Sequence, residues 1–123
     1  MRTLTILGAT GSIGASTLDV VGRHPDRFRV AALTAHSGIV AMLEACKRFR
    51  PAYAVMVDPG AAASLDAQVR AAGLDTQVLA GTSALDTVAA LPEVDTVMAA
   101  IVGAAGLSPT LAALYFAYPA LRG

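Results

Sequence analysis

The chain has 123 residues, of which 55% are hydrophobic and 15% charged, and its formal net charge at pH 7 is zero. This length fits one domain with a sizeable core, and the lack of a basic stripe argues against a nucleic-acid-binding protein. No apolar run is long enough to cross a bilayer and no signal peptide precedes the first predicted strand, so we expect no membrane partner. Cys46 is the only cysteine, which excludes an intrachain disulfide and suits a reducing cytoplasm.

The first predicted element is a short β-prone run at residues 4–7, followed by Gly8, Gly11 and Gly14. Apolar residues then recur with helical periodicity until Pro25 ends the pattern. In a strand–turn–helix of this kind, the first glycine permits a sharp reversal, the second lets a pyrophosphate approach the backbone, and the third lets the helix pack closely on the strand. The helix N-terminus would then face the phosphates. The motif predicts nucleotide binding, with an ordinary glycine-rich βα turn as the alternative reading.

The rest of the chain alternates further strands and helices. Strands are expected at residues 27–34, 53–57, 76–80 and 96–102. Helices are expected after Gly38, after Asp58 as an N-cap, after Thr82, and again from Thr110 to Leu114. The alternation predicts an α/β protein with a Rossmann-like, doubly wound parallel sheet of about five strands and helices on both faces. Ligands bind such sheets at the carboxyl ends of strands, so the first glycine turn and a second one at residues 103–106 are the candidate loops.

The turn after the second strand bears on the choice of dinucleotide. An acidic residue there usually grips the ribose hydroxyls of NAD, and residues 33–38 contain none. This permits NADP, although no lysine or arginine is present in the turn either. Ser37 could donate a hydrogen bond to a phosphate, and so could a protonated His36, whose alternative is a solvated loop histidine. Cys46 falls on the apolar face of the next predicted helix, which favours a small buried hydrophobic residue over a nucleophile.

Two segments carry a resemblance to one enzyme family. Residues 4–14 and 16–21, and then residues 97–107 and 109–113, closely resemble the amino-terminal part of 1-deoxy-D-xylulose 5-phosphate reductoisomerases. The first motif is shared loosely with other GATG-type reductases, and the second is much more specific. The resemblance implies a dinucleotide-binding domain over residues 1–114, with the phosphates of NADPH held by Thr10, Gly11, Ser12 and Ile13 through backbone and hydroxyl groups.

The resemblance also implies an activity for the complete enzyme. The family rearranges and reduces a phosphorylated deoxy sugar to 2-C-methyl-D-erythritol 4-phosphate, using NADPH and a divalent metal (Mg or Mn), in an early step of non-mevalonate isoprenoid biosynthesis. The loop at residues 100–106 would lie beside the nicotinamide. The family's acidic metal ligands, its substrate-phosphate site and its lid all lie beyond the matching region. No catalytic or metal-binding residue is therefore assigned here, and we expect the chain alone to be inactive.

This sequence departs from the family pattern in two places. The basic residue and asparagine that usually follow the second strand are replaced by Ser37 and Gly38, which should weaken the preference for NADP because a charge-assisted contact is lost. Residues 115–123 do not follow the family and look like a truncation or a foreign reading frame, without forming a separate domain. Apolar surface left exposed by a missing continuation could drive association, for example as a homodimer.

Two other functions stay open. One is a different GATG-type NADP reductase, which we disfavour because none of the tyrosines has a lysine four residues later. The other is a stand-alone nucleotide-binding module without catalysis.

Overall fold

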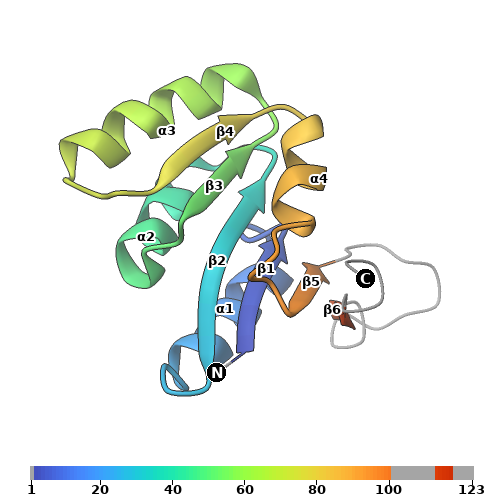
Figure 1. Ribbon diagram of the computed structural model, residues 1–123. Helices are drawn as coiled ribbons and strands as arrows, with labels where there is room; N and C mark the ends of the chain where they lie inside the picture. Colours follow the sequence, from blue (N-terminus) through green and yellow to red (C-terminus); the bar gives the residue numbers. More distant parts are fainter. Residues whose placement is uncertain (1, 101–112, 118–123) are drawn as a thin grey trace.

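A single sheet in the strand order β4-β3-β2-β1-β5-β6 forms the centre of the fold (Figure 1). The computed structural model describes residues 2–100 and 113–117. The strands are β1 Arg2–Leu7, β2 Phe28–Ala35, β3 Tyr53–Met56, β4 Gln77–Ala80, β5 Thr96–Ala100 and β6 Ala113–Ala117. The helices of the described residues are α1 Ser12–Gly22, α2 Ile39–Phe49, α3 Pro59–Ala71 and α4 Ser83–Ala89. Within the same residues, no helix combines the length and apolar character that a transmembrane span requires.

The five strands β4, β3, β2, β1 and β5 pair in parallel in this order, which confirms the predicted five-stranded parallel sheet. The chain runs outward from β1 to β4 and then returns to the other side of β1 to form β5. The strand order therefore reverses between β1 and β5, whose register pairs Leu4 with Thr96 and Leu7 with Ala99. The carboxyl ends of these two strands lie side by side, which makes this edge the topological switch point.

The last described strand differs from what the sequence pattern predicts. β6 runs antiparallel to β5, with Leu114 opposite Ala99. Ala113 and Leu114 were expected in a helix, whereas residues 110–112 and the glycine turn at residues 103–106 lie outside the described part of the chain. Two physical reasons favour a strand over a helix here. Tyr115 and Phe116 are β-prone residues. Pairing with β5 also satisfies backbone groups that the edge of the parallel sheet would otherwise leave unpaired.

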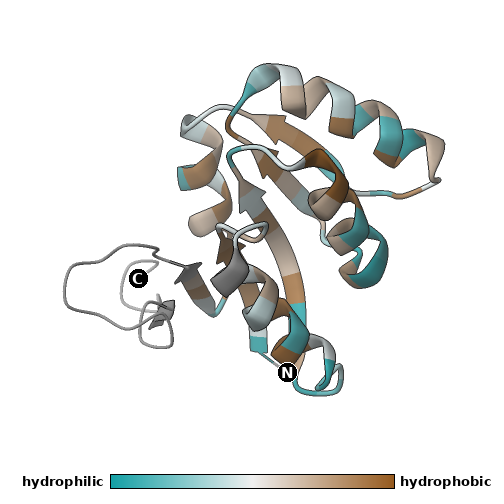
Figure 2. Ribbon diagram, turned by 180° about the vertical axis from the view of Figure 1, so that it is seen from behind, coloured by the Kyte–Doolittle hydropathy of each residue, from teal (hydrophilic) through white to brown (hydrophobic). Residues whose placement is uncertain are grey.

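Helices cover both faces of the sheet, as predicted. Helices α1, α2 and α3 pack on one face, over a core that includes Leu4, Ile6, Leu18, Leu33, Met42, Met56 and Leu65. Helix α4 packs on the other face, where Ala84 and Val88 contact Ala32 and Val55. Figure 2 shows predominantly hydrophobic colouring along the central strands, as expected for parallel strands that are buried on both faces.

Local chemistry sets several helix boundaries. A carboxylate oxygen of Asp58 accepts a hydrogen bond from the N–H of Ala61 at 2.8 Å, and Pro59 opens α3, which confirms the predicted N-cap. Helix α2 begins after Gly38, whose φ is +92°, and it ends at Phe49, followed by the C-cap residue Arg50 in the left-handed region (φ 46°). The lysine and arginine in its last turn stabilise the helix, because positive charges interact favourably with the negative end of the helix dipole.

Candidate functional site

The turn between β1 and α1, residues 8–11, lies at the switch point of the sheet. Gly8 has a φ of +74°, in the left-handed region that favours glycine, and the chain reverses there. Gly11 is the N-cap of α1, with an extended backbone at φ −74° and ψ 168°. Its N–H donates to the carbonyl oxygen of Gly8 at 3.3 Å, and its own carbonyl oxygen accepts from the N–H of Ala15 at 2.8 Å. These contacts close the turn and start the helix.

The second and third glycines of the motif have different surroundings. A Cβ atom on Gly14 would collide with the carbonyl oxygen of Gly8 and lie 2.9 Å from backbone atoms of Ala9. The first turn of α1 therefore packs directly on the glycine turn, as the motif predicts for the third glycine. A Cβ atom on Gly11 would have only one described neighbour, the carbonyl oxygen of Gly8 at 3.7 Å. The side of Gly11 is thus open, which is the property that close approach of a ligand to the backbone requires.

The turn is fixed to β2 and to the turn that follows β2. The N–H of Gly8 donates to the Thr34 hydroxyl oxygen at 3.2 Å, and the N–H of Ala9 donates to the Thr34 carbonyl oxygen at 2.8 Å. The hydroxyl of Thr10 donates to the carbonyl oxygen of Ser37 at 3.2 Å. Residues separated by 26 or 27 positions in the chain are therefore joined at the carboxyl edge of the sheet.

The four residues predicted to hold the cofactor phosphates are consecutive at this edge. Thr10 and Gly11 lie in the turn, and Ser12 and Ile13 are the first residues of α1. The N–H groups of a first helical turn have no partner within the helix. Helix α1 has no side-chain cap and no acidic residue in its first turn, so no carboxylate of its own competes for the positive end of the dipole. This helix start is therefore suited to an anion.

The turn after β2 offers polar groups but little charge. His36, Ser37 and Gly38 are all exposed, and no lysine or arginine lies among them. The carbonyl oxygen of His36 accepts from the N–H of Asp58 at 3.1 Å, which places the start of α3 next to this turn. The carboxylate of Asp58 is itself used to cap α3. A ligand phosphate at this position would thus find hydroxyl and imidazole groups rather than a permanent cation.

Cys46 has no part in this edge. Its side chain is fully buried in the core beneath α2, and burial raises the pKa of the thiol to about 11. The thiol therefore stays protonated at neutral pH and is a poor nucleophile. The interpretation of Cys46 as a small buried hydrophobic residue is confirmed.

Metal-ligating side chains do not gather anywhere in the part of the chain that the structure describes. No group of three or more histidine, cysteine, aspartate or glutamate residues there could hold a metal ion. The described residues therefore do not fit a divalent-metal site.

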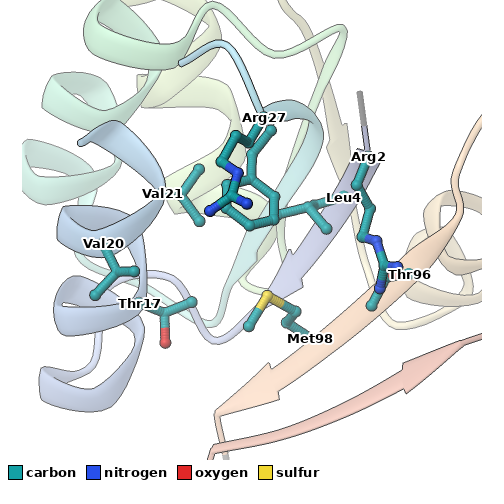
Figure 3. Close-up of a pocket in the computed structure, with 9 residues that line it drawn as sticks. Arg2, Leu4, Thr17, Val20, Val21, Arg27, Thr96 and Met98 are labelled. Carbon is teal, nitrogen blue, oxygen red and sulfur yellow. The ribbon is translucent and has the colours of Figure 1, made fainter. Parts of the chain in front are cut away.

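An open cavity of about 590 Å³ lies at the opposite, amino-terminal end of the sheet (Figure 3). It is formed between α1 and the first residues of β1 and β5, and its apolar lining residues are Leu4, Val20, Val21, Phe28 and Met98. The side chains of Arg2 and Arg27 also line it. Because ligands of open α/β sheets bind at the carboxyl ends of the strands, we do not assign this cavity to a dinucleotide.

Comparison with known proteins identifies one family. The family model for 1-deoxy-D-xylulose 5-phosphate reductoisomerase matches residues 4–117. The reductoisomerase of Nitrosospira multiformis is 63% identical over 113 residues, which cover 92% of this chain and 29% of the relative. That of Burkholderia cenocepacia is 58% identical over 112 residues, which cover 91% of this chain and 28% of the relative.

Solved structures give the same result. A DOX-P reductoisomerase in complex with NADPH, fosmidomycin and magnesium is 48% identical with a TM-score of 0.79, over 91% of this chain and 27% of that protein. The enzyme from Zymomonas mobilis in complex with NADPH is 46% identical with a TM-score of 0.73, over 90% of this chain and 28% of that protein. The chain thus spans less than a third of the length of these relatives. It belongs to the 1-deoxy-D-xylulose 5-phosphate reductoisomerase family and corresponds to the amino-terminal, Rossmann-like part of it.

Proposed function

We propose that this chain is the NADPH-binding domain of a 1-deoxy-D-xylulose 5-phosphate reductoisomerase, and that the N–H groups of residues 10–13 bind the cofactor phosphates. One observation carries the proposal: the uncapped start of α1, with an open face at Gly11, lies at the switch point of the sheet. Relatives that are 46–48% identical are described as NADPH complexes, which supports the same ligand here.

In the complete enzyme, bound NADPH would supply the hydride that reduces the rearranged deoxy sugar phosphate to 2-C-methyl-D-erythritol 4-phosphate, within isoprenoid biosynthesis. The residues of this chain bind and orient the dinucleotide: α1 holds the phosphates, and the turn at residues 36–38 lies where the 2′-phosphate is recognised. The described residues do not fit a metal site, so we assign metal and sugar binding to parts of the relatives that this chain does not match. A cytoplasmic location belongs to the proposal, since the free, buried thiol of Cys46 suits a reducing compartment.

The test is a calorimetric titration of the chain with NADPH, NADH and ATP, with folding checked by circular dichroism. We expect saturable binding of NADPH. The variant Gly11→Ala adds a methyl group that would not clash with described protein atoms but would lie close to the proposed phosphate site. The methyl group should keep a phosphate away from the backbone N–H groups. The loss of one charge-assisted hydrogen bond should weaken NADPH binding by about tenfold or more, with an unchanged melting temperature.

A folded chain that binds none of the three nucleotides would overturn the proposal and favour a stand-alone module with another role. Equal NADPH affinity for wild type and Gly11→Ala would instead mean that the phosphates do not bind at this turn. We also expect no oxidation of NADPH when 1-deoxy-D-xylulose 5-phosphate and Mg²⁺ are added to the chain alone. Measurable turnover would contradict that expectation.

A further inference from the structure

We propose that Thr34 is a positioning residue for the phosphate-binding turn. Its hydroxyl and carbonyl oxygens hold the first two N–H groups of that turn, and the following N–H groups are thereby directed at the dinucleotide. This inference rests on the function proposed above, since it concerns the same site. It assigns a role to a residue of β2 that lies outside the glycine motif.

Thr34 contacts the turn from a buried position in β2. Thr34 is only 2% exposed, and Ala9, whose N–H donates to its carbonyl oxygen, is 3% exposed. The N–H of Gly8 donates to the Thr34 hydroxyl at 3.2 Å, and the N–H of Ala9 donates to the Thr34 carbonyl oxygen at 2.8 Å. At Gly8 the left-handed backbone turns the chain out of the β1–β2 ladder, and a side-chain oxygen serves as acceptor there. Removing that oxygen would leave a part-buried donor without its partner, which costs more than the net value of one hydrogen bond.

Packing alone does not explain a threonine at this position. Valine has nearly the same shape and at least as strong a preference for strands, so it would fill a buried strand position as well as threonine does. The hydroxyls of two other buried threonines, Thr5 and Thr76, donate to carbonyl oxygens of Val88 and Pro51 at 2.9 and 2.7 Å, away from the turn. The Thr34 hydroxyl, in contrast, accepts a hydrogen bond from the glycine turn itself.

These differences provide a matched set of variants. Thr34→Val removes the acceptor and keeps the shape, whereas Thr34→Ser keeps the hydroxyl. Thr5→Val removes a buried hydrogen bond of a comparable kind that does not touch the turn. The readouts are the dissociation constant for NADPH from calorimetry, the melting temperature, and the exchange rate of the Gly8 amide hydrogen measured by NMR without cofactor.

We expect Thr34→Val to weaken NADPH binding by roughly three- to tenfold, the value of one net hydrogen bond, and to speed exchange of the Gly8 amide. Thr34→Ser should restore both values to within about twofold of wild type, since it keeps the hydrogen bond. Thr5→Val should lower the melting temperature without changing NADPH affinity. If Thr34→Val does not fold, Thr34→Cys keeps a similar volume with a much weaker acceptor and takes its place.

The inference is overturned if Thr34→Val binds NADPH like wild type, or if Thr5→Val weakens binding by the same factor. Failure of the proposed function gives a different result, because the wild-type chain would then not bind NADPH at all. In that case, unchanged Gly8 exchange in Thr34→Val would overturn the positioning role as well, and faster exchange would support it for whatever ligand the turn holds.

Discussion

The hydroxyl group of Thr10 donates a hydrogen bond to the carbonyl oxygen of Ser37 over 3.2 Å. This contact joins the turn after β1 to the turn after β2. The next residue, Gly38, also packs closely against Thr10, since a Cβ atom on Gly38 would lie 3.3 Å from the Thr10 side chain. In a dinucleotide-binding fold the first turn receives the phosphates and the second lies beside the adenosine ribose. The Thr10 side chain therefore fixes the distance between two parts of one binding site.

Breaking this contact should reduce cofactor affinity more than stability. Thr10→Val keeps the shape of the side chain and loses the hydrogen bond, so we expect NADPH binding to weaken by roughly three- to tenfold. The melting temperature should change little, because the contact is exposed to solvent. Calorimetry with NADPH measures the effect, and Thr10→Ser is the control that keeps the hydroxyl. An equal loss of affinity in Thr10→Ser would mean that the methyl group, not the hydrogen bond, is responsible.

A second prediction concerns the approach of α1 to the turn. In Gly14→Ala the new methyl group would collide with backbone atoms of Gly8 and Ala9, which cannot swing aside as a side chain can. The helix must shift, and we expect the free energy of unfolding to fall by about 1–3 kcal/mol, as for other overpacked sites. Urea denaturation of the folded chain measures this change.

Gly22, at the other end of α1, provides the control for that experiment. The three atoms nearest to a Cβ atom there would all belong to the guanidinium group of Arg48, the end of a flexible side chain. Gly22→Ala should therefore be neutral or stabilise the chain by up to about 1 kcal/mol through helix propensity. Similar unfolding free energies for Gly14→Ala and Gly22→Ala would contradict the close packing of α1 on the turn.

The site was predictable where its signals are local. The glycine spacing from Gly8 to Gly14, the apolar run before it and the helical periodicity after it all lie within one short segment, and they predicted the strand, the turn and the helix start that the structure shows. The contacts of Thr34 and Ser37 with this turn could not be predicted, because they depend on the register of β1 against β2. That register shifts between Leu4 and Thr5, and no pattern in the sequence marks the shift.

The carboxyl end of the described chain shows the opposite case, in which a local signal was misleading. Ser108 and Pro109 are typical of a helix start, and they led to the prediction of a helix up to Leu114. Pairing with β5 prevails for residues 113–117, since a strand partner satisfies backbone groups along a whole edge. The cavity beside Arg2 and Arg27 was also missed, because its lining comes from separate segments that share no sequence pattern.

The choice between NADPH and NADH can be tested at Ser37. Its carbonyl oxygen accepts the hydrogen bond from Thr10, and the residue is exposed. Because that contact uses the backbone and not the side chain, Ser37→Lys should leave it intact. A lysine would add a cation where the 2′-phosphate is expected, and we predict about tenfold tighter binding of NADPH with unchanged binding of NADH. Added salt should reduce the gain, because an exposed charge pair is screened. The neutral variant Ser37→Gln is the control, and tighter binding of both dinucleotides by Ser37→Lys would contradict a 2′-phosphate contact.

The buried thiol of Cys46 should make stability depend on pH in the alkaline range. Burial raises the pKa of this thiol from 9.0 to about 11, so the folded chain keeps the proton over a range in which the unfolded chain loses it. Below pH 9 both states hold the proton and the full stability is present. As the pH rises from the unfolded-state pKa of 9.0 to the folded-state pKa of about 11, stability is lost at about 1.4 kcal/mol per pH unit, and above both pKa values the dependence ends.

Cys46→Ala separates this effect from other groups that titrate at high pH. The variant also leaves a small cavity and should be less stable at every pH, so the slopes of unfolding free energy against pH are compared, not the absolute values. Urea denaturation at intervals from pH 8 to pH 11 should give a steeper decline for wild type than for Cys46→Ala, beginning near pH 9. Parallel curves for the two proteins would contradict the raised pKa of the thiol, which is attributed to burial of Cys46 in the core cluster that also contains Met42 and Leu65.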